Sequence, residues 1–200
     1  EAREQRVRPG RDDKVIVSWN GLAIDAFARA ARALDEPKYL AAAEAAAQFL
    51  YDQLREPDGR LLHCWRAGQA KLMAYLDDYA TLANALISLY EAGFQERWID
   101  WAVELTDAVL RHFSDPAGGP LFYTADDHES LIARTKDLQD GSVPSGNSMA
   151  AYLLVRLGRL TGRAEYLAAA ESIFLAASQI MQDSPPAVGQ LLLALDLYLG

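Results

Sequence analysis

Two kinds of apolar pattern alternate along the chain, both with the spacing of an α-helix. Segments of the first kind are apolar almost all round, which predicts helices that are buried on most sides. Segments of the second kind carry charged residues among the apolar ones, which predicts amphipathic helices with one face in solvent. The first kind is expected at about residues 20–34, 78–92 and 147–161, and the second at about 39–54, 98–113 and 166–181.

The two kinds of helix are joined in a unit that occurs three times along the chain. In each unit an aromatic residue lies at the head of the second helix, and a proline follows that helix. The aromatic residues are Tyr39, Trp98 and Tyr166, and the prolines are Pro57, Pro116 and Pro185. The repeat predicts three helical hairpins within one domain of residues 1–200, preceded by an extension over 1–17. We expect the hairpins at about 20–54, 78–113 and 147–181, and a last helix at about 187–199.

The connections between these helices differ strongly in length. The link inside each hairpin has about four or five residues, as expected for antiparallel neighbours. The links between hairpins, over 55–77 and 114–144, are long, and their runs "RLLHCW" and "PLFYT" are candidates for small strands. All long links therefore lie at the end of the bundle where the first helices of the hairpins begin. A site is expected at this end, which we call the rim.

Composition narrows the classes of partner. A net charge of -9, without a stripe of basic residues, excludes a nucleic-acid partner. Cys64 is the single cysteine, which rules out an internal disulfide and a cysteine metal site and favours a cytoplasmic location.

No apolar run approaches the ~20 residues of a membrane span. No metal or cofactor is expected, because the sequence has no spaced ligand set and no glycine-rich phosphate loop. The chain begins at Glu1 without a methionine, so we expect a processed product or a segment of a longer protein.

Three of the predicted buried helices begin with polar residues, in "VSWNGL", "YLDDYA" and "PSGNSM". These starts should meet at the rim, where the partial positive charge of helix N-termini favours carboxylates and hydroxyl-rich ligands. Asp77, Asp78 and His63 are the candidate catalytic residues. The candidate substrate-binding residues are Trp19, Asn20, Trp65, Tyr79, Ser145 and Asn147.

Each of these residues also has a structural explanation. Asp78 could cap its helix, and Asn147 could tie neighbouring helices together. His63 and His128 lie in the long links and could be exposed or stacked on an aromatic ring. Adjacent aspartates point in different directions on a helix, so a glycosidase pair would need a carboxylate from another loop. The carboxylates available for that role are Asp12, Asp13, Asp127 and Asp140.

Three segments resemble a known family: "DDKVIVSWNGLAIDAFARA", "YLDDYATLANALISLYEA" and "DGSVPSGNSMAAYLLVRLGRLTG". They are similar to the C-terminal part of the thioredoxin-domain proteins related to spermatogenesis-associated protein 20. The resemblance implies an all-α fold, an (α/α)6 toroid like that of N-acylglucosamine 2-epimerases and six-hairpin glycosidases. About half of such a toroid is present, without the family's thioredoxin-like domain. We expect the remainder of a longer chain, or a second copy, to cover the open edges.

Two hypotheses about function follow. In the first, the domain binds a sugar and converts it, as an epimerase, an isomerase or a glycoside hydrolase would. In the second, it is a non-catalytic scaffold whose helix-start motifs are purely structural. The second is favoured by the histidines, because the related epimerases use paired histidines and none lies on a predicted inner helix here.

Overall fold

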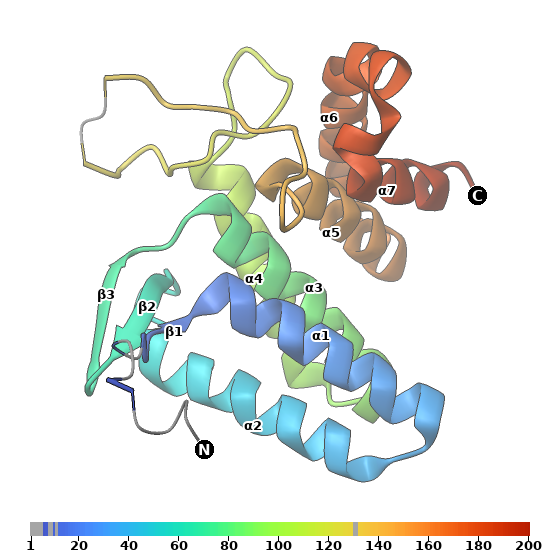
Figure 1. Ribbon diagram of the computed structural model, residues 1–200. Helices are drawn as coiled ribbons and strands as arrows, with labels where there is room; N and C mark the ends of the chain where they lie inside the picture. Colours follow the sequence, from blue (N-terminus) through green and yellow to red (C-terminus); the bar gives the residue numbers. More distant parts are fainter. Residues whose placement is uncertain (1–5, 8–9, 11, 130–131) are drawn as a thin grey trace.

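The computed structural model describes residues 6–7, 10, 12–129 and 132–200, and within these residues the protein is mostly helical. Seven α-helices and one small sheet make up the described part of the chain (Figure 1). The helices are α1 (Val17–Leu34), α2 (Pro37–Leu54), α3 (Leu76–Gly93), α4 (Glu96–His112), α5 (Gly146–Thr161), α6 (Ala164–Asp183) and α7 (Gly189–Leu199). The strands are β1 (Val15–Ile16), β2 (Leu62–Arg66) and β3 (Gln69–Met73), and a 3-10 turn over Pro185–Val188 precedes α7.

The helices form two layers. Helices α1, α3, α5 and α7 pack side by side in an inner row, and α2, α4 and α6 each pack on the inner helix that precedes them (Figure 1). These are antiparallel hairpins arranged as part of an α/α toroid, which confirms the predicted fold class. Helix α3 lies in the middle of the row and is buried along most of its length, from Leu76 to Leu89.

The first inner helix differs from the prediction. We expected α1 to be buried on most sides, but Trp19, Phe27 and Leu34 are exposed. The same is true of Leu193 and Leu199 on α7. The reason is position, because α1 and α7 lie at the two ends of the inner row and each has an inner neighbour on one side only. An apolar pattern around a helix thus indicates burial only where a neighbour is present.

The long links carry one sheet and one irregular segment. Strand β2 pairs antiparallel with β1 and with β3, so that Trp65 lies opposite Val15 and Leu62 opposite Met73. The run "RLLHCW" therefore contains a strand, as predicted. The run "PLFYT" does not, because its backbone is held by bonds to separate partners instead of a neighbouring strand. One of these is the Phe122 N–H donating to the Phe113 carbonyl.

The inner helices approach one another closely at the rim, and glycine permits this. A Cβ atom on Gly21 of α1 would lie 2.9 Å from the Leu82 nitrogen and the Thr81 carbonyl carbon of α3. A Cβ on Gly146 of α5 would lie 3.1 Å from the Leu76 side chain. The small residues at these helix starts therefore allow the row to close.

Gly21→Ala is expected to destabilise the fold by about 1–3 kcal/mol, because the new methyl group meets backbone that cannot move aside alone. The measurement is urea unfolding of the purified chain. Gly189→Ala is the matched control, since a Cβ at Gly189 meets nothing within 4 Å. Equal stabilities of the two variants would contradict the close-approach explanation.

Candidate functional site

A buried carboxylate joins three elements at the rim. Asp78, near the start of α3, has no exposed surface. Its Oδ1 accepts a hydrogen bond from the Ser18 N–H of α1 at 2.9 Å, and its Oδ2 accepts one from the Tyr75 N–H at 3.0 Å. The same Oδ2 lies 2.7 Å from Nδ1 of His63 on β2. Asp78 therefore holds two helix starts and one strand in fixed relative positions.

The neighbouring carboxyl group has a different environment. Asp77 is half-buried, and its Oδ1 is shielded from solvent without a hydrogen-bond partner among the described residues. Burial, followed by the negative charge of Asp78, raises the pKa of Asp77 to about 6. Burial and the charges of both aspartates also raise the pKa of Tyr123. Asp77 is thus a carboxyl group with spare bonding capacity beside a tyrosine, as a ligand site requires.

Aromatic rings surround this carboxyl pair. Tyr75 and Tyr123 are stacked, with ring centroids 4.9 Å apart. The rings of His63 and His128 lie 5.1 and 5.4 Å from that of Tyr75. The link after α4 is brought here by a backbone bond, in which the Leu76 N–H donates to the Tyr123 carbonyl at 3.0 Å. Sequence reasoning missed both tyrosines, although the run "PLFYT" drew attention to the segment that holds Tyr123.

The third polar helix start is occupied by internal bonds. Ser145 caps α5 by accepting a hydrogen bond from the Ser148 N–H at 3.1 Å. Asn147 accepts one from the Leu121 N–H at 2.8 Å and donates to the carbonyl groups of Leu121 and Asp137, both at 2.9 Å. Both amide hydrogens of Asn147 are engaged, so this side chain ties the link over 114–144 to α5.

The two predicted site residues at the start of α1 differ in their exposure to solvent. Trp19 is 62% exposed on the rim, so its ring is available to a ligand. Asn20 is half-buried and donates to the Ile16 carbonyl at 2.8 Å, which closes the first turn of α1.

Two other predicted site residues lie in packed surroundings. Trp65 is half-buried, and its ring meets that of Phe49 edge-on at 5.3 Å. Tyr79 has no exposed surface, and its hydroxyl accepts hydrogen bonds from the Leu61 N–H at 2.9 Å and from Arg60 Nε at 3.1 Å. In this structure the Trp65 ring packs the sheet against α2, and the Tyr79 hydroxyl joins α3 to the residues just before β2.

The four carboxylates weighed as partners for the aspartate pair are all bonded elsewhere. Asp12 pairs with Lys14, Asp13 with Arg66, and Asp127 with Arg60, while Asp140 accepts hydrogen bonds from the Ser145 and Gln190 N–H groups. Two ionisable groups do face the pair, Tyr123 and His63. Hydrogen bonding to Asp78 raises the pKa of His63, against the opposing effect of burial.

One set of side chains has the spacing of metal ligands. Ligand atoms of His112, Asp126 and Asp127 all lie within 4.8 Å of one another. However, Asp126 lies 2.9 Å from the His112 ring, and both oxygens of Asp127 bind the Arg60 guanidinium at 2.7 and 2.9 Å. These contacts account for the cluster without a metal ion.

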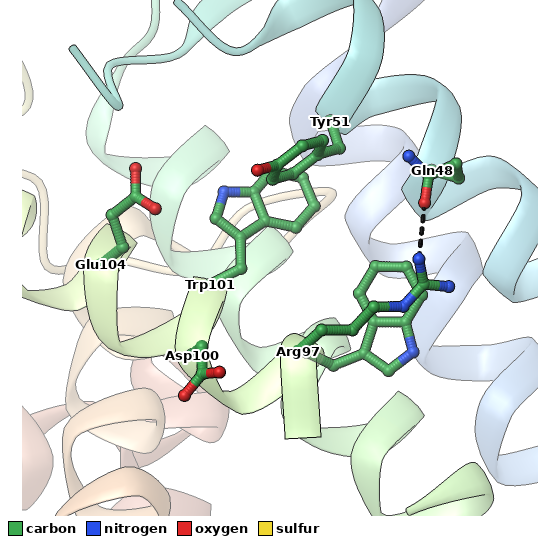
Figure 2. Close-up of a pocket in the computed structure, with 7 residues that line it drawn as sticks. Gln48, Tyr51, Arg97, Asp100, Trp101 and Glu104 are labelled. Carbon is green, nitrogen blue, oxygen red and sulfur yellow. Dashed lines mark hydrogen bonds between the residues drawn. The ribbon is translucent and has the colours of Figure 1, made fainter. Parts of the chain in front are cut away.

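A pocket of about 380 Å³ opens on the outer wall between α2 and α4 (Figure 2). Its edges are bridged by side chains of the two helices. Arg97 donates to Gln48 at 2.8 Å and lies over the Trp98 ring, and Arg55 binds Glu104 at its other end. We interpret this pocket as the seam between two outer helices.

A second cavity, of about 600 Å³, lies on the inner side of the row and receives residues from all four inner helices. Asn84 of α3 is among them, and it lies two helical turns after Asp77 on the same face of the helix. Asp77 therefore stands at the rim end of the face that lines this cavity. The cavity is lined by Leu22, Asp25, Arg29, Asn84, Pro144, Met149, Tyr152, Gln190, Leu193, Asp196 and Leu197.

The fold places the chain among the α/α toroids. It superposes on a GH76 α-mannanase of Bacteroides thetaiotaomicron with a TM-score of 0.76 at 12% identity, covering 96% of this chain and 54% of the mannanase. For a heparin-specific unsaturated glucuronyl hydrolase the TM-score is 0.74 at 15% identity, with 96% and 61% covered. For the cellobiose 2-epimerase of Spirochaeta thermophila it is 0.67 at 17%, with 85% and 43% covered. The chain thus has the fold of about half of a glycosidase or sugar-epimerase toroid.

Sequence similarity gives a more specific relationship. The chain is 33% identical over 201 residues to mouse spermatogenesis-associated protein 20, and 32% identical over 202 residues to an uncharacterised protein of Caenorhabditis elegans. These alignments cover 96% and 97% of the chain but 25% and 27% of the relatives. The chain is therefore homologous to spermatogenesis-associated protein 20 over about a quarter of that protein's length, which confirms the predicted resemblance.

No model of a known protein family matches the chain. Within the described part of the structure, none of the helices combines the length and the apolar character needed to cross a membrane.

Asn147→Ala is expected to lower the free energy of unfolding by about 2–4 kcal/mol, because it leaves three backbone groups without partners, two of them at Leu121. Chemical denaturation measures the change. Asn20→Ala loses a single half-buried bond and should cost about 1 kcal/mol or less. If both variants behaved alike, Asn147 would not be the tie described here.

Asp77→Asn should stabilise the chain at pH 7 by about 1–2 kcal/mol, because it removes a charge from a buried site. At a pH between the usual pKa of an aspartate and about 6, Asp77 is protonated in the folded chain but not in the unfolded chain. The wild type should therefore lose stability as the pH rises through this window, and Asp77→Asn should lose less.

Thermal unfolding at pH 4 to 8 measures both effects. Asp78→Asn is the matched control with the opposite sign. It is expected to cost about 1–3 kcal/mol, because an amide cannot accept all three hydrogen bonds of the carboxylate. A loss of stability in Asp77→Asn would contradict the difference between the two aspartates.

Proposed function

We propose that the rim site binds a carbohydrate and converts it, in the manner of a glycoside hydrolase or a sugar epimerase. The observation that carries this proposal is the shielded Oδ1 of Asp77, which has no hydrogen-bond partner in the described part of the chain. Leaving a buried polar atom without a partner costs about 1–3 kcal/mol, and a ligand that supplies the partner removes this cost. A sugar hydroxyl can donate the missing hydrogen bond.

The surroundings of Asp77 support a sugar rather than a charged ligand. The exposed ring of Trp19 offers a flat apolar surface for one face of a sugar ring. Tyr75 and Tyr123 add phenolic groups at the carboxyl pair. The cavity on the inner side, at about 600 Å³, lies within the range of small-molecule sites and mixes apolar with polar lining residues.

The toroid neighbours provide independent support. An α-1,6-mannanase of Salegentibacter has the same fold, with a TM-score of 0.63 at 16% identity. An inactive variant of that enzyme, with two consecutive aspartates replaced, was obtained in complex with α-1,6-mannotriose. Consecutive aspartates stand at the start of α3 in this chain as well. In the full toroid we propose that the opposite wall of the site comes from the remainder of a longer chain or from a second copy.

The scaffold hypothesis also has a specific observation in its favour. Hydrogen bonds to other groups of the protein engage the side chains of Ser145, Asn147 and Asp78, as expected of structural motifs. Under this hypothesis the Oδ1 of Asp77 has no ligand to bind, and it is one of several buried polar atoms without a partner among the described residues, such as Trp65 Nε1 and Thr124 Oγ1. The two hypotheses therefore differ in what replacement of Asp77 does to ligand binding.

Millimolar cellobiose or α-1,6-mannotriose is expected to raise the melting temperature of the chain by about 2–5 °C, because a ligand bound to the folded state stabilises it. Asp77→Asn should abolish this rise while folding normally. Asp100→Asn, in the outer pocket between α2 and α4, is the matched control and should keep it. A wild type that responds to neither saccharide, or a rise that persists in Asp77→Asn, would favour the scaffold.

A further inference from the structure

We infer that His63 is the proton-transfer residue of the rim site and that Asp78 is its positioning residue. This assignment rests on the proposed function and gives the two consecutive aspartates separate roles. The sequence presents Asp77 and Asp78 both as candidates for catalysis, and Asp78 also as a possible cap of its helix. Their contacts in the structure separate them, because one is saturated with internal bonds and the other is not.

Asp78 has the geometry of a group that holds another in place. Its carboxylate is fully buried and is fixed by the Ser18 and Tyr75 N–H groups before the histidine is considered. His63 adds a third contact at 2.7 Å through Nδ1. A carboxylate restrained in this way selects the tautomer of the imidazole and sets its orientation.

The Nε2 atom of His63, on the side of the ring away from Asp78, is available to a substrate. Nε2 makes no hydrogen bond within the described structure, and the side chain is 21% exposed. The edge of the ring meets Tyr75, which stacks on Tyr123 beside the aspartates. Nε2 is therefore the ring nitrogen that a substrate at this site can reach.

The charges facing His63 come from two segments. Asp78 and Asp77 on α3 both favour its protonated form, whereas Lys14, just before β1, opposes it. The hydrogen bond with Asp78 is the largest of these influences, and burial works against it. The imidazolium in turn lowers the pKa of Asp77, which burial and Asp78 raise. The positive charge of protonated His63 and the negative charge of ionised Asp77 thus stabilise each other.

His63 and Asp77 can exchange protons with a substrate so that the number of protons on the two side chains together stays the same. For a glycoside, Nε2–H of His63 would give its proton to the leaving oxygen as the bond from that oxygen to the sugar carbon breaks. Asp77 would take a proton from the water whose oxygen forms the new bond to that carbon. The balance is one proton given by His63 and one received by Asp77, with Nδ1–H still bonded to Asp78.

The test is an NMR titration of the full chain, which follows the ring nitrogens of its three histidines as the pH changes. We expect His63 to titrate above its usual pKa, with Nδ1 protonated in the neutral form. In Asp78→Asn its pKa should fall, because the hydrogen bond with Asp78 is the largest influence that raises it. Asp126→Asn is the matched control, since it removes a carboxylate from His112 and should leave His63 unchanged.

A second variant covers the case in which Asp78→Asn does not fold. His63→Gln keeps both backbone bonds to Asp78, and by removing the imidazolium it should raise the pKa of Asp77, measured on the carboxyl carbon. A His63 pKa at or below its usual value that is the same in wild type and Asp78→Asn would overturn the positioning role. An unchanged Asp77 pKa in His63→Gln would overturn the coupling.

The saccharide measurements separate this inference from the proposed function. Cellobiose or α-1,6-mannotriose that binds the wild type, and is converted equally well by His63→Gln, would overturn the role of His63 alone. If neither sugar binds while the His63 titration behaves as expected, the proposed function fails and the contact between Asp78 and His63 stands. Loss of conversion in His63→Gln with binding retained supports both.

Discussion

The structure of the rim depends on the buried carboxylate of Asp78. Removing a carboxylate from water costs several kcal/mol, and this cost is offset only when its oxygens are fully bonded. Here the donors come from three segments that are far apart in the sequence, at Ser18, His63 and Tyr75. The carboxylate can be satisfied only when α1, α3 and β2 take their native positions. The interaction that places the candidate site is therefore also one that makes its assembly cooperative.

The same region combines rigidity with a carboxyl oxygen that lacks a hydrogen-bond partner among the described residues. Glycines at positions 21 and 146 let the inner helices approach closely, and Asn147 fastens the long link between α4 and α5 to the start of α5. Within this rigid frame, Asp77 has an oxygen without a partner. A carboxyl oxygen that is shielded and lacks a partner lowers the stability of the fold locally, at the place where we propose that a ligand binds.

Periodicity predicted the helices well because their apolar spacing is a local property. It placed the start of α1 at about residue 20, whereas the helix begins at Val17, because the capping signals there are weak. The separate roles of Asp77 and Asp78 could not be assigned from the sequence, since they depend on partners on other elements. Tyr123 was missed for the same reason, as its link approaches α3 through a backbone bond that leaves no pattern in the sequence.

The small sheet has a consequence for the order in which the chain can fold. Strand β1 precedes the first hairpin and β2 follows it, so their pairing closes a loop that contains the whole of α1 and α2. In addition, α1 packs more extensively on α3 than on its hairpin partner. Many of the stabilising contacts therefore join residues that are distant in sequence. In such a chain, the entropy cost of closing long loops comes before the stabilising contacts of the inner row can form. The chain should therefore fold more slowly than a helical bundle built from local contacts.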